Sequence, residues 1–246
     1  MNIEKKNEIY DPETIILDPI ILHPIWYRQD SIMSKKFKKF FICSWGGCGS
    51  TILQNYLLNF GLSYHIHDPI PPINLKYAGK VINDQMRPWC HKEWTYINNN
   101  RYYEHFSEID IPNDDIHNCY MIFIYRNPIY SLYSRFYNPE HLKHIDCDPT
   151  IKIEDIINAK KDLYNIINFF KNYKYNKRNY KIIFIKYETI FDNWENLNNI
   201  LGIPNIPKLF PEKKEILKIM PLYNDIENIY KELILEMNKM NSIEIL

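Results

Sequence analysis

Apolar residues along the chain gather in short continuous runs that alternate with stretches of helical spacing. Three runs pass from a polar edge into an almost unbroken apolar stretch, namely KKFKKFFICSW (35–45), CYMIFIYR (119–126) and YKIIFIKYE (180–188). Such runs are typical of strands buried on both faces. A shorter run, LSYHIH (62–67), predicts another strand, which ends at the proline-rich turn DPIPP (68–72).

Between these strands, apolar residues recur at intervals of three and four, as they do on one side of a helix. In STILQNYLLNFG (50–61) this spacing predicts a helix that ends at Gly61. The same reasoning predicts further helices that begin at Pro128, run unbroken over 151–175, cover 192–202, and fill the tail 212–246.

Strands that alternate with helices favour a parallel sheet with helices on both faces. A length of 246 residues allows one such domain with a sizeable core. We therefore expect a single α/β domain of three layers around a central parallel sheet. Two segments do not fit the alternation: residues 1–36 read as an irregular N-terminal arm, and residues 73–116 as a lid or an acceptor-side insertion.

Composition narrows the classes of function only slightly. The formal net charge is +0, so no overall field favours a nucleic acid or an anionic membrane. The 5 cysteines form no CxxC pair and predict free thiols in a reducing compartment. The sequence shows neither a membrane-length apolar run nor a signal-peptide core near its start, so we expect a soluble protein of the cytoplasm or another intracellular compartment.

The first candidate site is the segment SWGGCGST (44–51), which holds three of the 6 glycines of the chain. Glycine allows positive φ and close approach of a ligand to the backbone. A strand, a glycine-rich turn and a helix start together form a cradle for a phosphate. The loop lacks the Lys of a P-loop, although it has the hydroxyls of Ser50 and Thr51. A purely structural turn is the alternative interpretation.

A second candidate site follows the strand CYMIFIYR. Arg126 ends this strand and Ser134 comes eight residues later, on the expected helix. A guanidinium and a hydroxyl are suited to a phosphate, whereas a magnesium-dependent nucleotidase would place an Asp at such a strand end. These residues predict a second phosphate held without a metal. Pairing of Arg126 with a local carboxylate is the alternative.

Taken together, CGST (48–51), RNPIYSLYS (126–134) and KYE (186–188) resemble the motifs of sulfotransferases that use 3′-phosphoadenosine 5′-phosphosulfate. The resemblance runs in the same order over roughly residues 38 to 203, and the Arg-to-Ser spacing is its most specific part. It implies a P-loop-NTPase-like topology. It also implies sulfuryl transfer to a hydroxyl or amine, with this nucleotide as co-substrate and no metal.

The resemblance also assigns roles to particular residues. Gly49, Ser50 and Thr51 would bind the 5′-phosphosulfate, in a cofactor-binding loop that also includes Gly47 and Cys48. Arg126 and Ser134 would bind the 3′-phosphate, and Tyr187 would lie near the adenine. The chain departs from the family pattern at Gly47, where a Lys or Arg usually stands, and at Ile52, where an aromatic residue often stands.

The candidate base for the acceptor proton lies in SYHIHDP (63–69). His65 and His67 alternate along the predicted strand and therefore share a face, close to its carboxyl end. Histidine suits proton transfer near neutral pH. A core histidine and half of a metal site are the alternatives. Further candidates are His91 and His105 for the base, and Lys76 and Lys80 for the missing loop cation.

Two classes of function remain open at this point. The leading one is a sulfotransferase acting on a small-molecule or glycan acceptor, with phenol, lipid and peptide Tyr also open. The other is a non-catalytic nucleotide-binding or interaction protein of the same fold, which Gly47 favours. A small-molecule kinase is disfavoured by the missing loop Lys and by Arg126. We expect neither a nucleic-acid partner nor a membrane span.

Overall fold

The computed structural model describes residues 38–66, 68–79, 86–88, 93–97, 100–104, 107–111, 115–136, 147–148, 150–212 and 222–246. The predicted N-terminal arm, residues 1–36, lies outside the described residues. Within them, no helix has both the length and the apolar character needed to cross a membrane.

The main sheet is open and mixed, with the strand order β10-β9-β8-β1-β2. The strands are β1 (Lys38–Cys43), β2 (Gly61–Ile66), β8 (Cys119–Tyr125), β9 (Ile182–Lys186) and β10 (Ile243–Ile245). Neighbours among β2, β1, β8 and β9 are parallel, and β10 pairs antiparallel with β9 at the edge. The expected α/β fold is therefore confirmed, but the expected parallel sheet is corrected to a mixed one.

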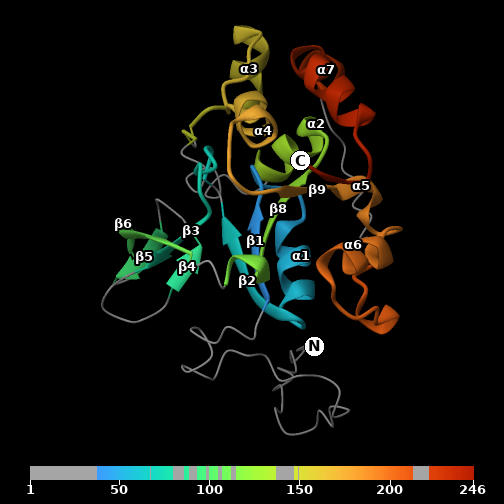
Figure 1. Cartoon of the computed structure of the whole chain (residues 1–246). Coiled ribbons are helices and arrows are strands. Elements are labelled where there is room, and N and C mark those ends of the chain that lie inside the picture. Colours follow the sequence, from blue (N-terminus) through green and yellow to red (C-terminus); the bar gives the residue numbers. More distant parts are fainter. Residues whose placement is uncertain are drawn as a thin grey trace, which may run out of the picture.

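One face of the sheet is covered by four helices, which Figure 1 shows together above the strands: α2 (Pro128–Phe136), α3 (Ile153–Ala159), α4 (Ile166–Tyr175) and α7 (Tyr223–Lys239). Phe123 of β8 lies at the centre of this layer, stacked on Tyr173 with ring centroids 4.6 Å apart. Phe169, Phe170 and Phe184 complete the aromatic cluster around it. Large rings of this kind supply much of the buried apolar area of a core.

The other face is covered by α1 (Ser50–Leu57), α5 (Tyr187–Ile190) and α6 (Trp194–Leu201). The alternate residues of the same strands, such as Phe40, Ile42 and Ile122, form this second core. The strands are thus apolar on both faces, as their unbroken apolar runs predict. Both layers hold the carboxyl ends of β1, β8 and β9 side by side, where Figure 1 places α2 and α5.

The segment 73–116 forms small antiparallel sheets outside the main sheet. One has the order β4-β3-β7 and the other is the hairpin β5-β6. Their strands are β3 (Lys76–Gly79), β4 (Met86–Pro88), β5 (Glu93–Ile97), β6 (Asn100–Glu104) and β7 (Ser107–Asp110). Figure 1 shows β3, β4, β5 and β6 beside β2, on the opposite side of the sheet from α6. This arrangement fits an insertion, and its role as a lid stays a prediction.

Three details of the expected helices are wrong. The single helix over 151–175 is two helices, because Lys160 and Asn165 take left-handed φ values of 50° and 57°. The Asp162 carboxylate accepts the backbone N–H groups of Tyr164 and Ile167 and so fixes the break. Gly61 is no helix stop, since α1 ends at Leu57 and Gly61 begins β2.

The tail is the third detail: α7 gives way to the edge strand β10, so residues 212–246 are not helical throughout. Two short 3₁₀ turns, Ile116–Asn118 and Pro207–Leu209, complete the described elements. The first of these turns precedes β8 and carries Asp115 at its start.

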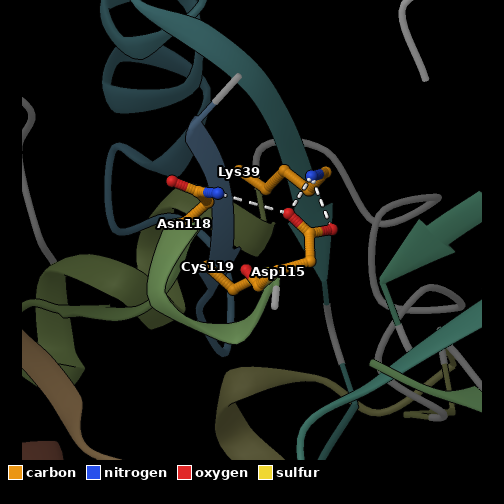
Figure 2. A network of polar contacts seen from close by, with 4 residues as sticks. All are labelled: Lys39, Asp115, Asn118 and Cys119. Atoms are coloured by element: carbon orange, nitrogen blue, oxygen red, sulfur yellow. Dashed lines mark hydrogen bonds and ion pairs between the residues drawn. The ribbon is translucent and has the colours of Figure 1, made fainter. Parts of the chain in front are cut away.

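A buried ion pair joins this turn to the inner strand β1. Figure 2 shows Lys39 Nζ of β1 donating to both carboxylate oxygens of Asp115 at 2.7 Å, with Asn118 beside the same carboxylate. The side chains of Lys39 and Asp115 are only 3% and 10% exposed. Each charge is compensated by the other, so the loss of one partner leaves the other charge buried.

We expect Lys39→Met to lower the free energy of unfolding by about 3–5 kcal/mol, because Asp115 would stay buried without its cation. The double variant Lys39→Met/Asp115→Leu should recover most of this loss. Lys174→Met, at a more exposed pair with Glu236, is the matched control and should cost about 1 kcal/mol or less. Urea unfolding measures all three, and equal losses at both pairs would contradict the prediction.

Candidate functional site

The glycine-rich loop lies at the carboxyl end of the inner strand β1 and leads directly into α1. Gly46, Gly47 and Gly49 have φ values of 117°, 64° and 80°, a region that side chains other than glycine rarely adopt. The turn therefore needs glycine for its backbone alone. In parallel sheets this edge is where ligands bind.

The glycines also allow four neighbouring residues to approach the loop. A Cβ on Gly47 would lie 2.7 Å from the Ser131 carbonyl oxygen and 3.0 Å from Ser134 Cβ. A Cβ on Gly49 would overlap the ring of Tyr187, and one on Gly46 would overlap the guanidinium of Arg135. The loop is thus packed against α2 on one side and against the start of α5 on the other.

The first turn of α1 has the features of an anion cradle. Its N-cap is Gly49 in a left-handed conformation, with no side-chain cap and no acidic residue in the first turn. The first amides of a helix otherwise remain without intrahelical partners, and the helix dipole favours a negative charge there. Ser50 is buried and accepts a hydrogen bond from Ser44 Oγ at 3.1 Å, whereas the Thr51 side chain is exposed.

Arg126 follows β8 and reaches the loop from the next strand. Its Nη1 donates to the Gly47 carbonyl oxygen at 3.3 Å. Its guanidinium lies between two rings, 4.6 Å from the centroid of Tyr187 and 5.1 Å from that of Tyr130. Among the described residues, no carboxylate forms an ion pair with Arg126, which disfavours the alternative of a local pair. Stacking on aromatic faces leaves the edge of a guanidinium available for hydrogen bonds.

Glu188 ties the strand ends together. Its Oε1 accepts the backbone N–H of Asn127 at 2.8 Å, and Asn127 Oδ1 in turn accepts the N–H of Ile129 at the start of α2. The residue after Tyr187 is thereby bonded to the residue after Arg126. Burial, together with the charges of Glu188 and Glu244, raises the pKa of the Tyr125 hydroxyl, so Tyr125 stays neutral.

Cys48 and Arg135 form the underside of the loop. The Cys48 thiol donates to the Gly46 carbonyl oxygen at 3.1 Å and lies 3.3 Å from Ser131 Oγ. Burial raises its pKa, against the lowering effects of the Ser131 hydrogen bond and of the charges of Arg135 and Arg126. Cys48 is therefore a protonated packing group near neutral pH. Burial also lowers the pKa of Arg135, whose Nη2 donates to the Trp45 carbonyl oxygen at 3.5 Å.

The structure brings together most of the residues that the sequence predicts for binding. Residues 47–51 form one turn, Arg126 and Ser134 lie against Gly47, and Tyr187 lies against Gly49. Tyr187 is only 8% exposed. Its ring therefore supports the loop and Arg126, and it offers little open surface on which a base could stack.

The candidate bases are less well placed. His65 is half-buried in β2, in register with Ile42 of β1. Neighbouring residues of paired strands point to the same face, so His65 lies on the face covered by α1. None of the contacts just described involves His65. The other candidates, His67, His91 and His105, lie outside the described residues, as does Lys80, and Lys76 is placed only as part of β3.

Sequence reasoning missed Arg135, Ser131 and Glu188. Arg135 follows Ser131 by four residues and Leu132 by three, so all three occupy the buried side of α2. That spacing was the available signal for a buried arginine. Glu188 is part of the KYE motif, but its bond to Asn127 joins residues distant in sequence and has no local signal.

Within the described part of the chain, no group of three or more His, Cys, Asp or Glu side chains is arranged to hold a metal ion. In comparisons with known proteins, no family model, no curated protein and no solved structure matches this chain. The chemistry of the site therefore has to be argued from its own residues.

We expect Gly49→Ala to destabilise the fold for two separable reasons, the positive φ and the overlap with Tyr187. Gly202→Ala is the matched control, because Gly202 has a φ of 59° but only Lys38 Nζ, at 3.5 Å, near its Cβ position. The control should cost about 1–3 kcal/mol, and Gly49→Ala more. In a Tyr187→Ala background, Gly49→Ala should lower the free energy of unfolding by about as much as the control does. A chemical-denaturation cycle showing simple additivity would contradict this packing.

Proposed function

We propose that the chain is a sulfotransferase-like enzyme that moves a sulfuryl group from 3′-phosphoadenosine 5′-phosphosulfate to a hydroxyl or amine. One observation carries the proposal: three segments that are far apart in sequence meet at one loop. Arg126 donates to the Gly47 carbonyl, Ser134 lies beside Gly47, and Tyr187 packs on Gly49. These are the segments whose motifs resemble that family.

Two anion-binding regions support a nucleotide with phosphates at both ends of its ribose. The first amides of α1, with Ser50 and Thr51, would hold the 5′-phosphosulfate. Arg126 and Ser134, which lie against Gly47, would hold the 3′-phosphate. We also assign a P-loop-like topology to the fold, because the loop joins the inner strand β1 to α1 and its neighbours are β2 and β8.

The proposed reaction is a direct in-line transfer. A lone pair of the acceptor oxygen or nitrogen attacks the sulfur, and the bond from sulfur to the bridging oxygen breaks. The acceptor proton passes to a base, for which His67 and His65 are the candidates. The leaving group is adenosine 3′,5′-bisphosphate. Catalysis of this kind depends on positioning and on stabilisation of the developing charge.

The identity of the strand-end residue favours recognition by a guanidinium over recognition by magnesium. Arg126 stands where a metal-dependent nucleotidase would have an Asp, and the loop lacks the Lys of such enzymes. A small-molecule kinase is therefore the weaker enzyme candidate. The acceptor is a small molecule or a glycan in this proposal.

A non-catalytic nucleotide-binding protein is the second candidate, and Gly47 favours it. The family's usual basic residue at this position would stabilise the bridging oxygen as the sulfuryl group leaves. Here α2 occupies the space that a side chain at this position would need. Tight binding of the nucleotide without transfer to any acceptor would support this second candidate.

We expect the chain to bind adenosine 3′,5′-bisphosphate well above ATP, in the absence of magnesium. Arg126→Ala should weaken this binding by roughly 10- to 100-fold, because a charge-assisted hydrogen bond contributes about 1.5–3 kcal/mol. Arg126→Lys keeps the positive charge but loses the several donors of a guanidinium. Its affinity should therefore lie between that of the parent and that of Arg126→Ala. Calorimetric titration measures each affinity. Equal affinities of Arg126→Ala and the parent would refute the assignment of Arg126.

We expect His67→Ala to lower the turnover by about 10²–10⁴-fold if His67 is the base, while the affinity for the product nucleotide stays within about threefold. His65→Ala should lower the turnover less than His67→Ala if His65 only packs in β2. If His65 is the base instead, His65→Ala should show the larger loss. A single-turnover assay beside a binding titration separates these outcomes. Full activity of both variants would exclude this strand as the source of the base and point to His91 or His105.

A further inference from the structure

The loop has no room for a cation at position 47. A Cβ there would lie 2.7 Å from the Ser131 carbonyl oxygen, which belongs to the backbone of α2 and cannot turn away as a side chain can. The φ of 64° adds backbone strain for any residue other than glycine. A Lys at this position would therefore have to displace α2. The positive charge for a ligand in the loop has to come from another element.

The helix that excludes a side chain at Gly47 also brings a guanidinium to the loop. Arg135 lies in the last turn of α2, and its guanidinium occupies the space where Gly46 would carry a Cβ. Its Nη2 donates to the Trp45 carbonyl oxygen at 3.5 Å. Arg135 thus contacts the loop at Gly46, whereas Arg126 contacts it at Gly47. Both contacts lie in the turn that precedes α1.

Arg135 is well suited to act through the loop. It is only 6% exposed, and a charge acts more strongly in a buried site than in water. A guanidinium stays protonated even when buried. The charges of both arginines reach the loop, since each favours the thiolate form of Cys48 at its centre.

We propose that Arg135 is a positioning residue that supplies, from beneath the loop, the positive charge that the family's loop Lys or Arg supplies from within it. This inference rests on the proposed function and deepens it. Arg135 favours ligands with a 5′-phosphate or 5′-phosphosulfate on the loop, and Arg126 favours the 3′-phosphate. The two arginines divide the recognition of one nucleotide between its two ends.

The test measures affinities by calorimetry for adenosine 5′-phosphate, adenosine 3′-phosphate and adenosine 3′,5′-bisphosphate. Arg135→Gln removes the charge but keeps a donor for the Trp45 carbonyl, and Arg135→Lys keeps the charge. Arg178→Gln is the control away from the loop, because Arg178 also donates to a backbone carbonyl, that of Asn176, although Arg178 is half-buried where Arg135 is buried. Thermal unfolding of each variant confirms that the fold is retained.

We expect Arg135→Gln to weaken both ligands that carry a 5′-phosphate by about tenfold and the 3′-phosphate by less than about twofold. Arg135→Lys should stay close to the parent, Arg178→Gln should change nothing, and Arg126→Ala should show the opposite selectivity. If Arg135 served only in folding, Arg135→Gln and Arg135→Lys would both lower the affinity for all three nucleotides, and to the same extent. That result, or no change, would overturn the role of Arg135 and leave the proposed function standing.

Failure of the proposed function has a different signature, namely a parent protein that binds none of the three nucleotides. Inorganic sulfate and phosphate are then the probes. Binding of either ion by the parent and by Arg135→Lys, lost in Arg135→Gln, supports the charge role at an anion site of another kind. No binding of these ions, or equal binding by all variants, overturns the inference as well.

Discussion

The site depends on the close packing of α2 against a loop of glycines. Backbone atoms of Ser131 and the side chains of Ser134 and Arg135 occupy the places where Gly46 and Gly47 would carry Cβ atoms. This contact brings α2 directly onto the carboxyl end of β1 and determines where Ser134 and Arg135 lie. The positive φ values of the loop are part of the same constraint, since only glycine adopts them without strain.

On the other side, Tyr187 fills the space beside Gly49, and Arg126 stacks on the ring of Tyr187. Glu188 then bonds the end of β9 to the end of β8 through the N–H of Asn127. Three strand ends are thus held together by these side-chain contacts. The two aromatic cores on either side of the sheet keep these strands in register.

These contacts explain why the structure gives more support to the proposed nucleotide binding than to the proposed catalysis. The residues for anion binding converge: an uncapped helix start, two arginines and several hydroxyls surround one turn. The candidate bases do not converge in the same way, since His65 faces α1 from β2. A nucleotide-binding role therefore has the stronger geometric argument, and transfer chemistry depends on residues beyond those contacts.

The sequence by itself determined the four parallel strands of the main sheet, most of the helices and the position of the candidate loop. Continuous apolar runs predicted β1, β8 and β9, because a strand covered on both faces must be apolar on both. Only the tertiary structure decided the break at Asp162, the strand β10 in the tail and the contact of Arg135 with the loop at Gly46. Strand pairing and steric contacts join residues far apart in sequence, and the Asp162 carboxylate at the break also accepts a hydrogen bond from the distant Tyr230 hydroxyl, so none of these features leaves a local periodicity. Gly47 needs both kinds of information. The sequence shows that the loop lacks a Lys at this position, and the packing of α2 against the loop gives the physical reason.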